Sequence, residues 1–210
     1  MAARQILSDI GYYDLKPGKL ATVVTSLEML TKPDIPHTAS RIDANLDAWS
    51  PADPASYRAL FRHVGENWLW CSRLLMTDDE LSVIVNDVQV DVYAVMQNGM
   101  AGGLLELDYR QPMTCEISYF GLGSELIGQG VGGWLMCQAI KHAWSHDIQR
   151  LWVHTCTLDH PGALGFYQHF GFKPFKQQIE IIDDPRLHGT LPRTAAPQIP
   201  MITQNSNMEH

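Results

Sequence analysis

The stretch GLGSELIGQGVGGWL, residues 121–135, places closely spaced glycines directly before a helical pattern. A strand-like run, MTCEISYFGL (residues 113–122), leads into it. A helix that starts at such a loop turns unpaired backbone N–H groups toward one point, at the positive end of its dipole. The stretch therefore predicts a loop that binds a phosphate group. The glycines whose missing Cβ lets the backbone approach an anion are Gly128, Gly130, Gly132 and Gly133.

The glycine spacing also satisfies the dinucleotide-binding pattern G-x-G-x-x-G, through Gly128, Gly130 and Gly133. That pattern belongs to a sheet of repeated strand-helix units. Here a meander of strand-like runs precedes the loop and one further strand-helix unit follows, so the dinucleotide interpretation is disfavoured. A Walker loop is excluded because no Gly-Lys-Ser/Thr is present. A plain flexible connector is also disfavoured, since the helix begins at once.

Hydrophobic periodicity and turn signals predict the other elements. Asn98-Gly99 is a strong hairpin signal between two strand-like runs. A second helical region is expected at 66–86, although Thr77-Asp78-Asp79 could break the helix. The order predicts a mixed α/β fold with one sheet. The remaining expected elements are a strand at 19–30, a helix at 50–65 that starts with a serine cap, helices at 131–144 and 161–172, and strands at 150–158 and 173–182.

Length and composition predict one globular domain, residues 1–183, followed by a Pro-, Thr-, Gln- and Asn-rich extension, residues 184–210. We expect the extension to dock on the domain or on a second copy, which would make a homodimer. The net charge of −8 argues against nucleic-acid and membrane partners, which want clustered Lys and Arg. Four scattered cysteines indicate a reducing compartment and no structural zinc. Without a signal-like or membrane-length apolar run, the expected location is cytoplasmic.

Two separated motifs carry a family resemblance. ISYFGLGSELIGQGVGGWLMCQAI (117–140) contains a loop of the R/Q-x-x-G-x-G/A kind, and RLWVHTCTLDHPGALGFYQHFGFKPF (150–175) contains A-x-x-x-Y-x-x-x-G-F. Together they resemble the acetyl-CoA-binding half of the GNAT superfamily of N-acetyltransferases, over about residues 88–182. The resemblance implies a GNAT-like fold. Its central, mostly antiparallel sheet would be splayed at the CoA-binding strand and flanked by helices, with acetyl-CoA as cosubstrate and no metal.

The chain departs from the family pattern at two positions. Ile127 stands where the family usually has Arg or Gln, so the backbone must hold the pyrophosphate, helped by Gln129 if that side chain reaches in. His160 stands where the family often has Asn, which affects a contact to the pantetheine arm. The resemblance implies a cofactor-binding set of Phe120, Leu122, Ile127, Gly128, Gln129, Gly130, Val131, Gly132, Gly133, His160 and Ala163.

Acyl transfer to an amine needs a base, because an ammonium with a pKa near 10.4 is only about one part in a thousand neutral at pH 7.4. Glu116 matches the position at which some members of the superfamily carry their base. The alternative is a strand glutamate that faces solvent or pairs with Arg. His154, one strand over, could assist or replace Glu116, although a core role is the commoner one for such a histidine. Glu28, Glu106 and Asp108 are candidates for an amine pocket or for solvated positions.

The leaving thiolate needs a proton, and Tyr167 matches the family tyrosine that donates it; a core aromatic is the alternative. Backbone N–H groups near 120–122 would stabilise the oxyanion, as the resemblance implies. The sequence thus predicts transfer of an acetyl group from acetyl-CoA to a primary amine of a small molecule by direct attack. The first strand, the first two helices and the extension would shape the acceptor pocket. A protein or peptide amine, or a CoA-binding module without catalysis, are the alternatives.

Overall fold

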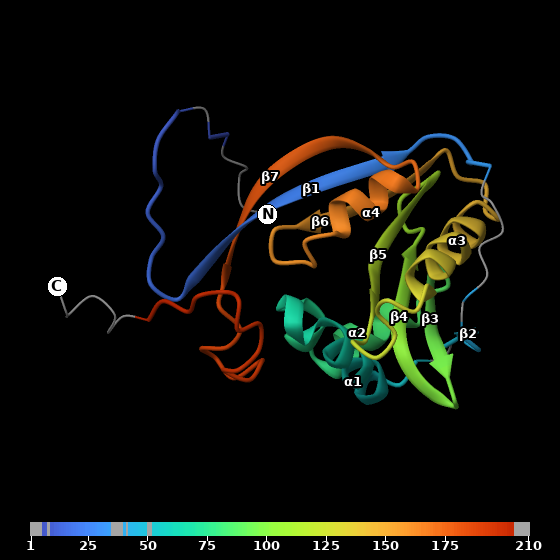
Figure 1. Cartoon of the computed structure of the whole chain (residues 1–210), viewed down its shortest axis with the longest axis horizontal. Helices are drawn as coiled ribbons and strands as arrows, with labels where there is room; N and C mark the ends of the chain where they lie inside the picture. Colours follow the sequence, from blue (N-terminus) through green and yellow to red (C-terminus); the bar gives the residue numbers. More distant parts are fainter. Residues whose placement is uncertain (1–5, 8, 35–39, 41, 50–51, 204–210) are drawn as a thin grey trace.

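A seven-stranded mixed sheet runs through the protein, with the strand order β2-β3-β4-β5-β6-β1-β7 (Figure 1). The computed structural model describes residues 6–7, 9–34, 40, 42–49 and 52–203. The strands are β1 Lys19–Met29, β2 Asn45–Ala48, β3 Val90–Gln97, β4 Met100–Asp108, β5 Thr114–Leu122, β6 Arg150–Cys156 and β7 Lys173–Asp183. The helices are α1 Pro54–Gly65, α2 Asp78–Val85, α3 Val131–Ala143 and α4 Ala163–His169, with short 3₁₀ turns η1 Glu66–Trp68 and η2 Ser72–Leu74.

The mixed α/β fold is confirmed, and most elements lie where the sequence patterns place them. Asn98 and Gly99 both have positive φ, the backbone of the expected tight hairpin between β3 and β4. The region 66–86 is broken at Thr77-Asp78-Asp79, as the sequence allows: Thr77 begins α2 through a reciprocal capping box with Glu80. Before Thr77 the region contains only the two 3₁₀ turns and no α-helix. No sequence pattern predicts strand β2. The side chain that caps α1 is Asp53, while Ser50 lies outside the described residues.

The sheet consists of two antiparallel parts joined by one short parallel pairing. β2 to β5 form one part, and β6, β1 and β7 form the other. Between the parts, β5 pairs with β6 only over Thr114–Ile117 and Arg150–Val153. Beyond these pairs β5 stays bonded to β4 while β6 stays bonded to β1. The sheet therefore opens from Ile117 onward, which is the splay that the family resemblance implies.

The first strand in the sequence lies far from the meander that follows it. β1 is inserted between β6 and β7 and is antiparallel to both. Figure 1 shows β1 and β7 side by side along the far edge of the sheet. As a result, the opening beside β6 is bordered by the N-terminal strand as well as by the C-terminal half of the chain.

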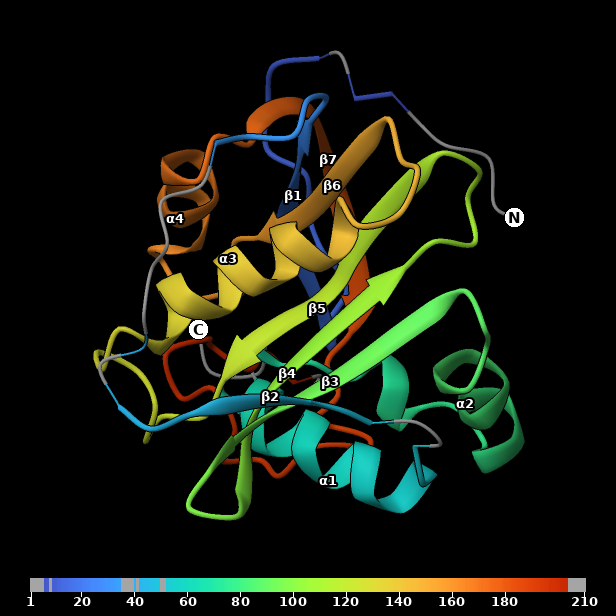
Figure 2. The same ribbon diagram turned by 90° about the vertical axis from the view of Figure 1, so that its right-hand side faces the viewer.

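Helices cover the sheet from both sides (Figure 2). α3 and α4 pack on one face, where Val131, Leu135, Met136, Ala139, Ile140 and Ala143 of α3 are buried in the core. α1 and α2 pack with β3 and β4 on the other face. Such two-sided burial agrees with the continuous apolar character of the central strands. None of the helices in the described ranges has the length and apolar composition that a bilayer crossing needs.

The stretch after β7 folds back onto the body of the protein up to the end of the described residues at Thr203. Leu191, Ala195 and Ala196 join a third apolar cluster with Leu20 of β1 and Leu69, which follows η1. A buried ion pair fixes the start of this stretch: the Arg186 guanidinium donates to Asp184 at 2.7 and 2.9 Å and to the carbonyls of Ala195, Ala196 and Ile199.

Candidate active site

A cavity of about 870 Å³ lies at the point where β5 and β6 part. Its walls include residues 117–122 of β5, residues 153–156 of β6 and the first turns of α4. Trp68 to Ser72, Thr22 and Val24 of β1, and Glu180 to Asp183 of β7 line it as well. A cavity of this volume can hold a drug-sized ligand. The first strand borders it as expected. No residue of α1, of α2 or of the described part of the extension lines it, and the segment between α1 and α2 does so instead.

The free edge of β5 provides hydrogen-bonding groups along the cavity. Residues 119–122 pair with β4 on one edge, and on the other edge no described strand pairs with them because β6 has turned away. Backbone N–H and C=O groups alternate along a strand edge and need partners. The edge at Phe120 to Leu122 is therefore where a ligand with amide and carbonyl groups can bond to the backbone.

The glycine loop ends at the same cavity. Gly128 and Gly130 both have φ near +80°, a left-handed backbone that suits glycine, and Gly130 is the N-cap of α3. No side chain caps this helix start, so its first N–H groups are open to an anion. Ile127 is about half exposed and lines the cavity. The Gln129 amide does not reach toward it, because it donates to the Glu125 carbonyl.

The predicted cofactor-binding residues divide into two groups. Those at the cavity wall are Phe120, Leu122, Ile127, Gly132, His160 and Ala163. Gly128, Gln129, Gly130 and Gly133 do not line it, and they belong to the loop and the helix start beside it. The Val131 side chain is buried in the core, so only its backbone is available to a ligand. The His160 ring accepts a hydrogen bond from the Gly162 N–H at 3.0 Å and contacts Trp68 edge-on.

Glu116 and His154 are neighbours across the parallel strand pair. Glu116 Oε1 lies 3.4 Å from His154 Nδ1. His154 lines the large cavity, whereas Glu116 lines a smaller one of about 340 Å³ with Asp108, Arg110 and Trp152. The bond to Glu116 raises the pKa of His154 above its usual value, against the opposing effect of burial, and the charges of Glu116 and Asp159 add to the rise. The histidine is thus the group of this pair that faces the cavity.

Tyr167 faces the cavity from α4 on the wall opposite β1. Its ring is buried between Phe120, Phe166 and Phe172, with centroids 5.7 to 6.2 Å away. Burial raises the pKa of the phenol well above 10, and the charge of Asp159 raises it further. The hydroxyl therefore keeps its proton at neutral pH. Both roles weighed for this residue, core aromatic and cavity proton donor, agree with its position.

Asp159 and Trp70 connect the two sides of the cavity, and the sequence patterns did not single them out. The Asp159 carboxylate accepts from the Thr155 hydroxyl and the Cys156 N–H, each at 2.8 Å. It also accepts from the Trp70 indole N–H at 3.3 Å. The only available signal was the apolar Trp-Leu-Trp run at 68–70, in a segment whose structure the sequence left unclear.

The three other carboxylates considered for an amine pocket lie outside the large cavity. Glu106 is fully buried and bonds to the Tyr57 hydroxyl at 2.5 Å and to the Arg73 guanidinium. Asp108 pairs with Arg110, and Glu28 pairs with Arg150 at 2.7 Å. Each of these carboxylates therefore already pairs with an arginine, and Glu106 also belongs to a buried hydrogen-bond network. The carboxylates at the large cavity are Asp159, Glu180 and Asp183.

Two cysteines also line the cavity, Cys71 and Cys156. Burial raises the pKa of both thiols, and nearby carboxylates raise it further. Both therefore remain protonated, and weakly nucleophilic, at neutral pH. In the described part of the chain, no three His, Cys, Asp or Glu side chains are grouped so that they could hold a metal ion.

Comparison with known families and structures gives a consistent result. The sequence profile of the acetyltransferase (GNAT) family matches residues 46–172. No curated protein sequence matches the chain. The structure resembles a GNAT-related N-acetyltransferase from Sphaerobacter thermophilus, with a TM-score of 0.59, 10% identity and 78% of this chain covered. A putative GNAT acetyltransferase from Novosphingobium aromaticivorans gives a TM-score of 0.53, 16% identity and 80% coverage.

A third similar structure is a GNAT acetyltransferase from Elizabethkingia anophelis, solved with acetyl-CoA bound. Its TM-score is 0.50 at 19% identity, and the match covers 64% of this chain and 78% of that one. The chain spans 52% of the length of the Sphaerobacter protein and 68% of the Novosphingobium protein. At these identities the likeness concerns the fold.

Proposed function

Because the chain belongs to the GNAT family of acetyltransferases, we propose that it transfers the acetyl group of acetyl-CoA to a primary amine of a small molecule. The observation that carries the proposal is the cavity at the strand opening, which has His154 on one wall and Tyr167 on another. When bound, acetyl-CoA supplies an activated acetyl group as a thioester. The acetyl-CoA complex of the Elizabethkingia protein, which has the same fold, supports this choice of donor.

The residues at the opening fit the donor. Backbone groups along the free edge of β5 at Phe120 to Leu122 suit the amide-rich arm of CoA, and N–H groups there can stabilise negative charge on the carbonyl oxygen. The open start of α3 after Gly130 suits its pyrophosphate. Ile127 adds no charge at this point, so the backbone carries the anion. Ala163, with its small side chain, and the exposed His160 ring border the same path.

We assign the proton transfers to three side chains. His154 takes a proton from the attacking amine, and Glu116, 3.4 Å behind it, orients the ring and stabilises its charged form. Glu116 is thus a positioning residue in this proposal. Tyr167, whose phenol stays protonated, gives a proton to the leaving thiolate. The raised pKa of the Cys71 and Cys156 thiols favours direct attack by the amine over an acyl-cysteine route.

The acceptor side of the cavity favours a small amine with an apolar body. Trp68, Leu69 and Trp70 line it together with Val24 and Ile182. Apolar walls bind apolar groups with little direction, and the carboxylates of Glu180 and Asp159 provide a place for the cationic end of the amine. A walled cavity of this kind suits a free amine better than a lysine on a folded surface.

The test is a release assay for free CoA thiol with acetyl-CoA and a panel of amines that contains aromatic, aliphatic and polar members and short peptides. Turnover with the apolar small amines is expected. Turnover with peptides alone would overturn the small-molecule assignment. Thermal stabilisation by CoA without turnover on any amine would point to a CoA-binding module instead, and no stabilisation by CoA would contradict the proposal altogether.

A further inference from the structure

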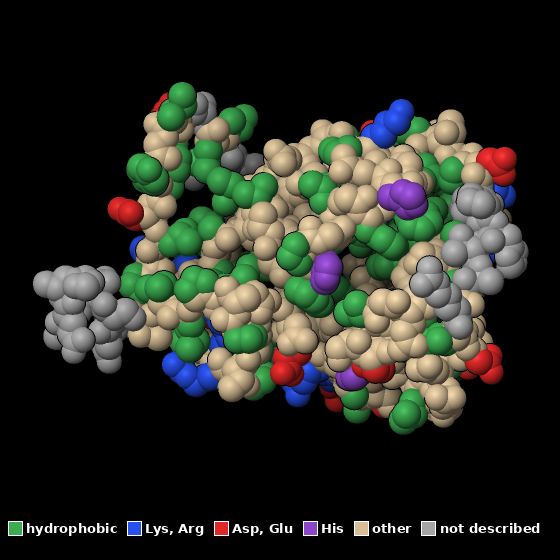
Figure 3. Space-filling model, viewed as in Figure 1, with side chains coloured by type: hydrophobic (Ala, Val, Ile, Leu, Met, Phe, Trp, Pro, Cys, Tyr) green, Lys and Arg blue, Asp and Glu red, His purple; other side chains and the backbone are tan. Residues whose placement is uncertain are grey.

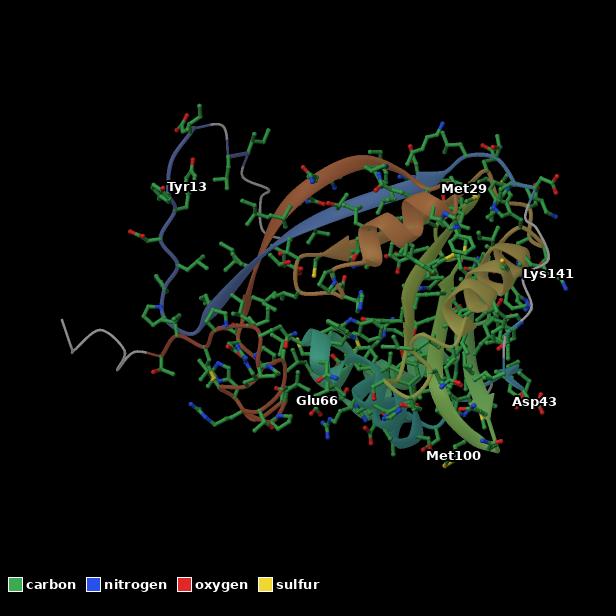
Figure 4. All side chains as sticks on the ribbon, viewed as in Figure 1. Tyr13, Met29, Asp43, Glu66, Met100 and Lys141 are labelled. Atoms are coloured by element: carbon green, nitrogen blue, oxygen red, sulfur yellow. The ribbon has the colours of Figure 1, made fainter. Side chains whose placement is uncertain are left out.

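An N-terminal arm stands away from the body of the protein. The arm, residues 6–7 and 9–17 of the described chain, contains no helix or strand and leads into β1. Figure 1 shows it as the long blue loop beside β1 and β7, and Figure 3 shows open space between it and the rest of the surface. The side chain of Tyr13 projects from it in Figure 4. The arm is therefore not part of the core that the helices and sheet form.

The arm is nevertheless apolar. Ile6, Ile10 and Tyr12 are 91%, 107% and 104% exposed, as much as in an unfolded chain. Tyr13 and Leu15 are also exposed. Scattered apolar residues on a surface are ordinary, but several in one projecting segment mark a site of interaction. The arm thus carries side chains that are stabilised only if another surface covers them.

A second uncovered apolar surface lies next to the arm, on β7. This strand is eleven residues long and is the last in the sheet, so no described strand pairs with its outer edge. Phe175, Ile179 and Ile181 are exposed along it, and Val23 of β1, the pairing partner of Ile179, is exposed beside them. Exposed edge strands tend to pair with other chains unless they are covered or charged. β7 has charged residues at 173, 176, 180 and 183, but the three apolar side chains between them are uncovered.

We propose that a second copy of this chain covers β7, and that the arm of each copy lies along β7 of the other. The lengths match: the ten residues from 6 to 15 span about 33 Å when extended, close to the span of an eleven-residue strand at about 3.3 Å per residue. Both segments carry charges of both signs, so the match rests on their length and on their exposed apolar side chains.

The exchange is self-complementary, which is what a two-fold dimer requires. Each copy has one arm and one uncovered β7, so two copies satisfy both surfaces and leave neither open. An arm together with β7 contributes about twenty residues from each copy, which is the lower limit of a standard interface of about 20–30 residues a side. Glu180 to Asp183 at the end of β7 also line the cavity, so the partner's arm would border the site.

The first experiment measures the mass of the full chain by size-exclusion chromatography with light scattering. We expect twice the 23.6 kDa of one chain. Replacing Ile10 and Tyr12 by Ser removes apolar groups from the arm, and Ile179→Glu places a charge on β7. Each change should raise the dimer dissociation constant by about tenfold or more. All three side chains are exposed, so the monomer should keep its fold and its circular dichroism spectrum.

Val88→Glu is the matched control. Val88 is 99% exposed and follows α2, so it belongs neither to the arm nor to β7. This variant should remain a dimer. A monomeric parent chain would overturn the proposal, as would a dimer that survives both the arm and the β7 variants.

A cross-linking experiment on mixed variants distinguishes a dimer in which the arms are exchanged from other kinds of dimer. Tyr12→Cys and Ile179→Cys are made in separate chains, and a thiol-specific cross-linker is added to each alone and to the mixture. Only the mixture should show a new cross-linked dimer that neither variant gives alone. A dimer with no such product would mean that the arm does not lie on the partner's β7. None of these measurements depends on acetyltransferase activity, so they stand even if the acceptor or the donor proves different.

Discussion

At the scale of single side chains, the properties of His154 depend on its neighbour Glu116. A glutamate next to the cavity would be a weak base at neutral pH if it were alone. Here the Glu116 carboxylate does not line the large cavity. It contacts the His154 imidazole, which does line it, and so acts on the cavity through that ring. In the proposed mechanism, the strength of His154 as a base therefore depends on Glu116.

The pH profile of the rate tests whether Glu116 controls the basicity of His154. The pKa of His154 is raised, so below that value the ring holds a proton and cannot accept one, and kcat/KM should rise as the pH passes through it. Glu116→Gln removes the carboxylate charge and leaves at most a weaker hydrogen bond from a neutral amide oxygen, so the causes of the rise are lost or reduced. The acidic limb of the profile should therefore move to lower pH, toward the ordinary value of about 6.5 or below it, with a lower plateau. An unchanged limb would mean that the pair does not control the reaction.

His154→Gln should lower kcat by about 10²- to 10⁴-fold, the usual effect of losing a general base. Binding of CoA, followed by thermal shift, should be unchanged because the histidine does not lie at the glycine loop. The two readouts distinguish the loss of a base from a distorted site. Reduced CoA binding with unchanged kcat would contradict the assignment.

Tyr167→Phe should lower kcat by about 10²-fold and leave the KM for acetyl-CoA near that of the parent. The ring is buried and touches three other aromatic rings, and phenylalanine keeps those contacts. The melting temperature should therefore change little. If the variant lost stability and kept its kcat, the tyrosine would be a core residue only.

At the scale of elements, glycines let α1, β5 and the Trp70 segment pack closely. A Cβ on Gly121 would lie 2.4 Å from a methyl of Val64 in α1 and 3.0 Å from the Trp70 ring. Such contacts are too short for real atoms, and neither neighbour is the end of a long flexible chain. Gly121 therefore sets how near Trp70 lies to the strand that forms the cavity wall.

Gly121→Ala should lower the free energy of unfolding by about 1–3 kcal/mol, as overpacking does. It should also raise the KM for the amine, since Trp70 lines the cavity. Gly165→Ala in α4 is the control: no neighbour lies within 4 Å of the added Cβ, and alanine is the better helix former. Chemical denaturation of both variants checks the difference. Equal losses would show that close packing at Gly121 is not the cause.

The elements that could be predicted from the sequence are those whose pattern is strong and local. α3 shows helical spacing over thirteen residues, and the hairpin at Asn98-Gly99 depends on two adjacent residues. β2 has four residues, mostly exposed, and its polar-apolar alternation, Asn-Leu-Asp-Ala, is too short to predict a strand. Residues 66–77 take their shape from packing: Leu69 has a φ of 56° and joins the cluster of the C-terminal stretch. No local signal could foretell that.

The site could be predicted only where a motif names its residues. Tyr167, Phe120 and Ala163 lie at the cavity as the resemblance implied. The acceptor side depends on which distant segments meet. β1 borders it because it is inserted beside β6, and Trp70 is held there by Asp159. Pairing between residues so far apart leaves no trace in the periodicity of either segment.

At the scale of the whole molecule, the stretch after β7 supports the cavity from outside. Its apolar residues cover Leu69, which is both a member of that cluster and a cavity residue. The Gln198 amide also donates to the Asn67 carbonyl at 2.9 Å. The buried pair of Arg186 and Asp184 holds the start of the stretch, so breaking this pair should lower the stability of the whole protein.

Arg186→Ala should lower the free energy of unfolding by about 3–5 kcal/mol, because it leaves the Asp184 carboxylate buried without its partner. Lys19→Ala, which breaks the exposed pair with Asp183 at the same end of β7, should leave stability unchanged within error. Urea denaturation measures both. A small effect of Arg186→Ala would mean that water reaches the carboxylate.

The insertion of β1 between β6 and β7 also sets the order in which the chain can fold. Lys19 and Asp183 are 164 positions apart, so at about 5–20 residues per second a ribosome needs roughly 8–30 seconds to make β7 after β1 has emerged. β1 lacks both of its strand partners until β6 is made and lacks β7 until the end, and contacts of such long range form slowly. The β2–β5 part can assemble earlier from neighbouring segments. The cavity, which β1, β6 and β7 all border, is thus completed only in the last stage of folding.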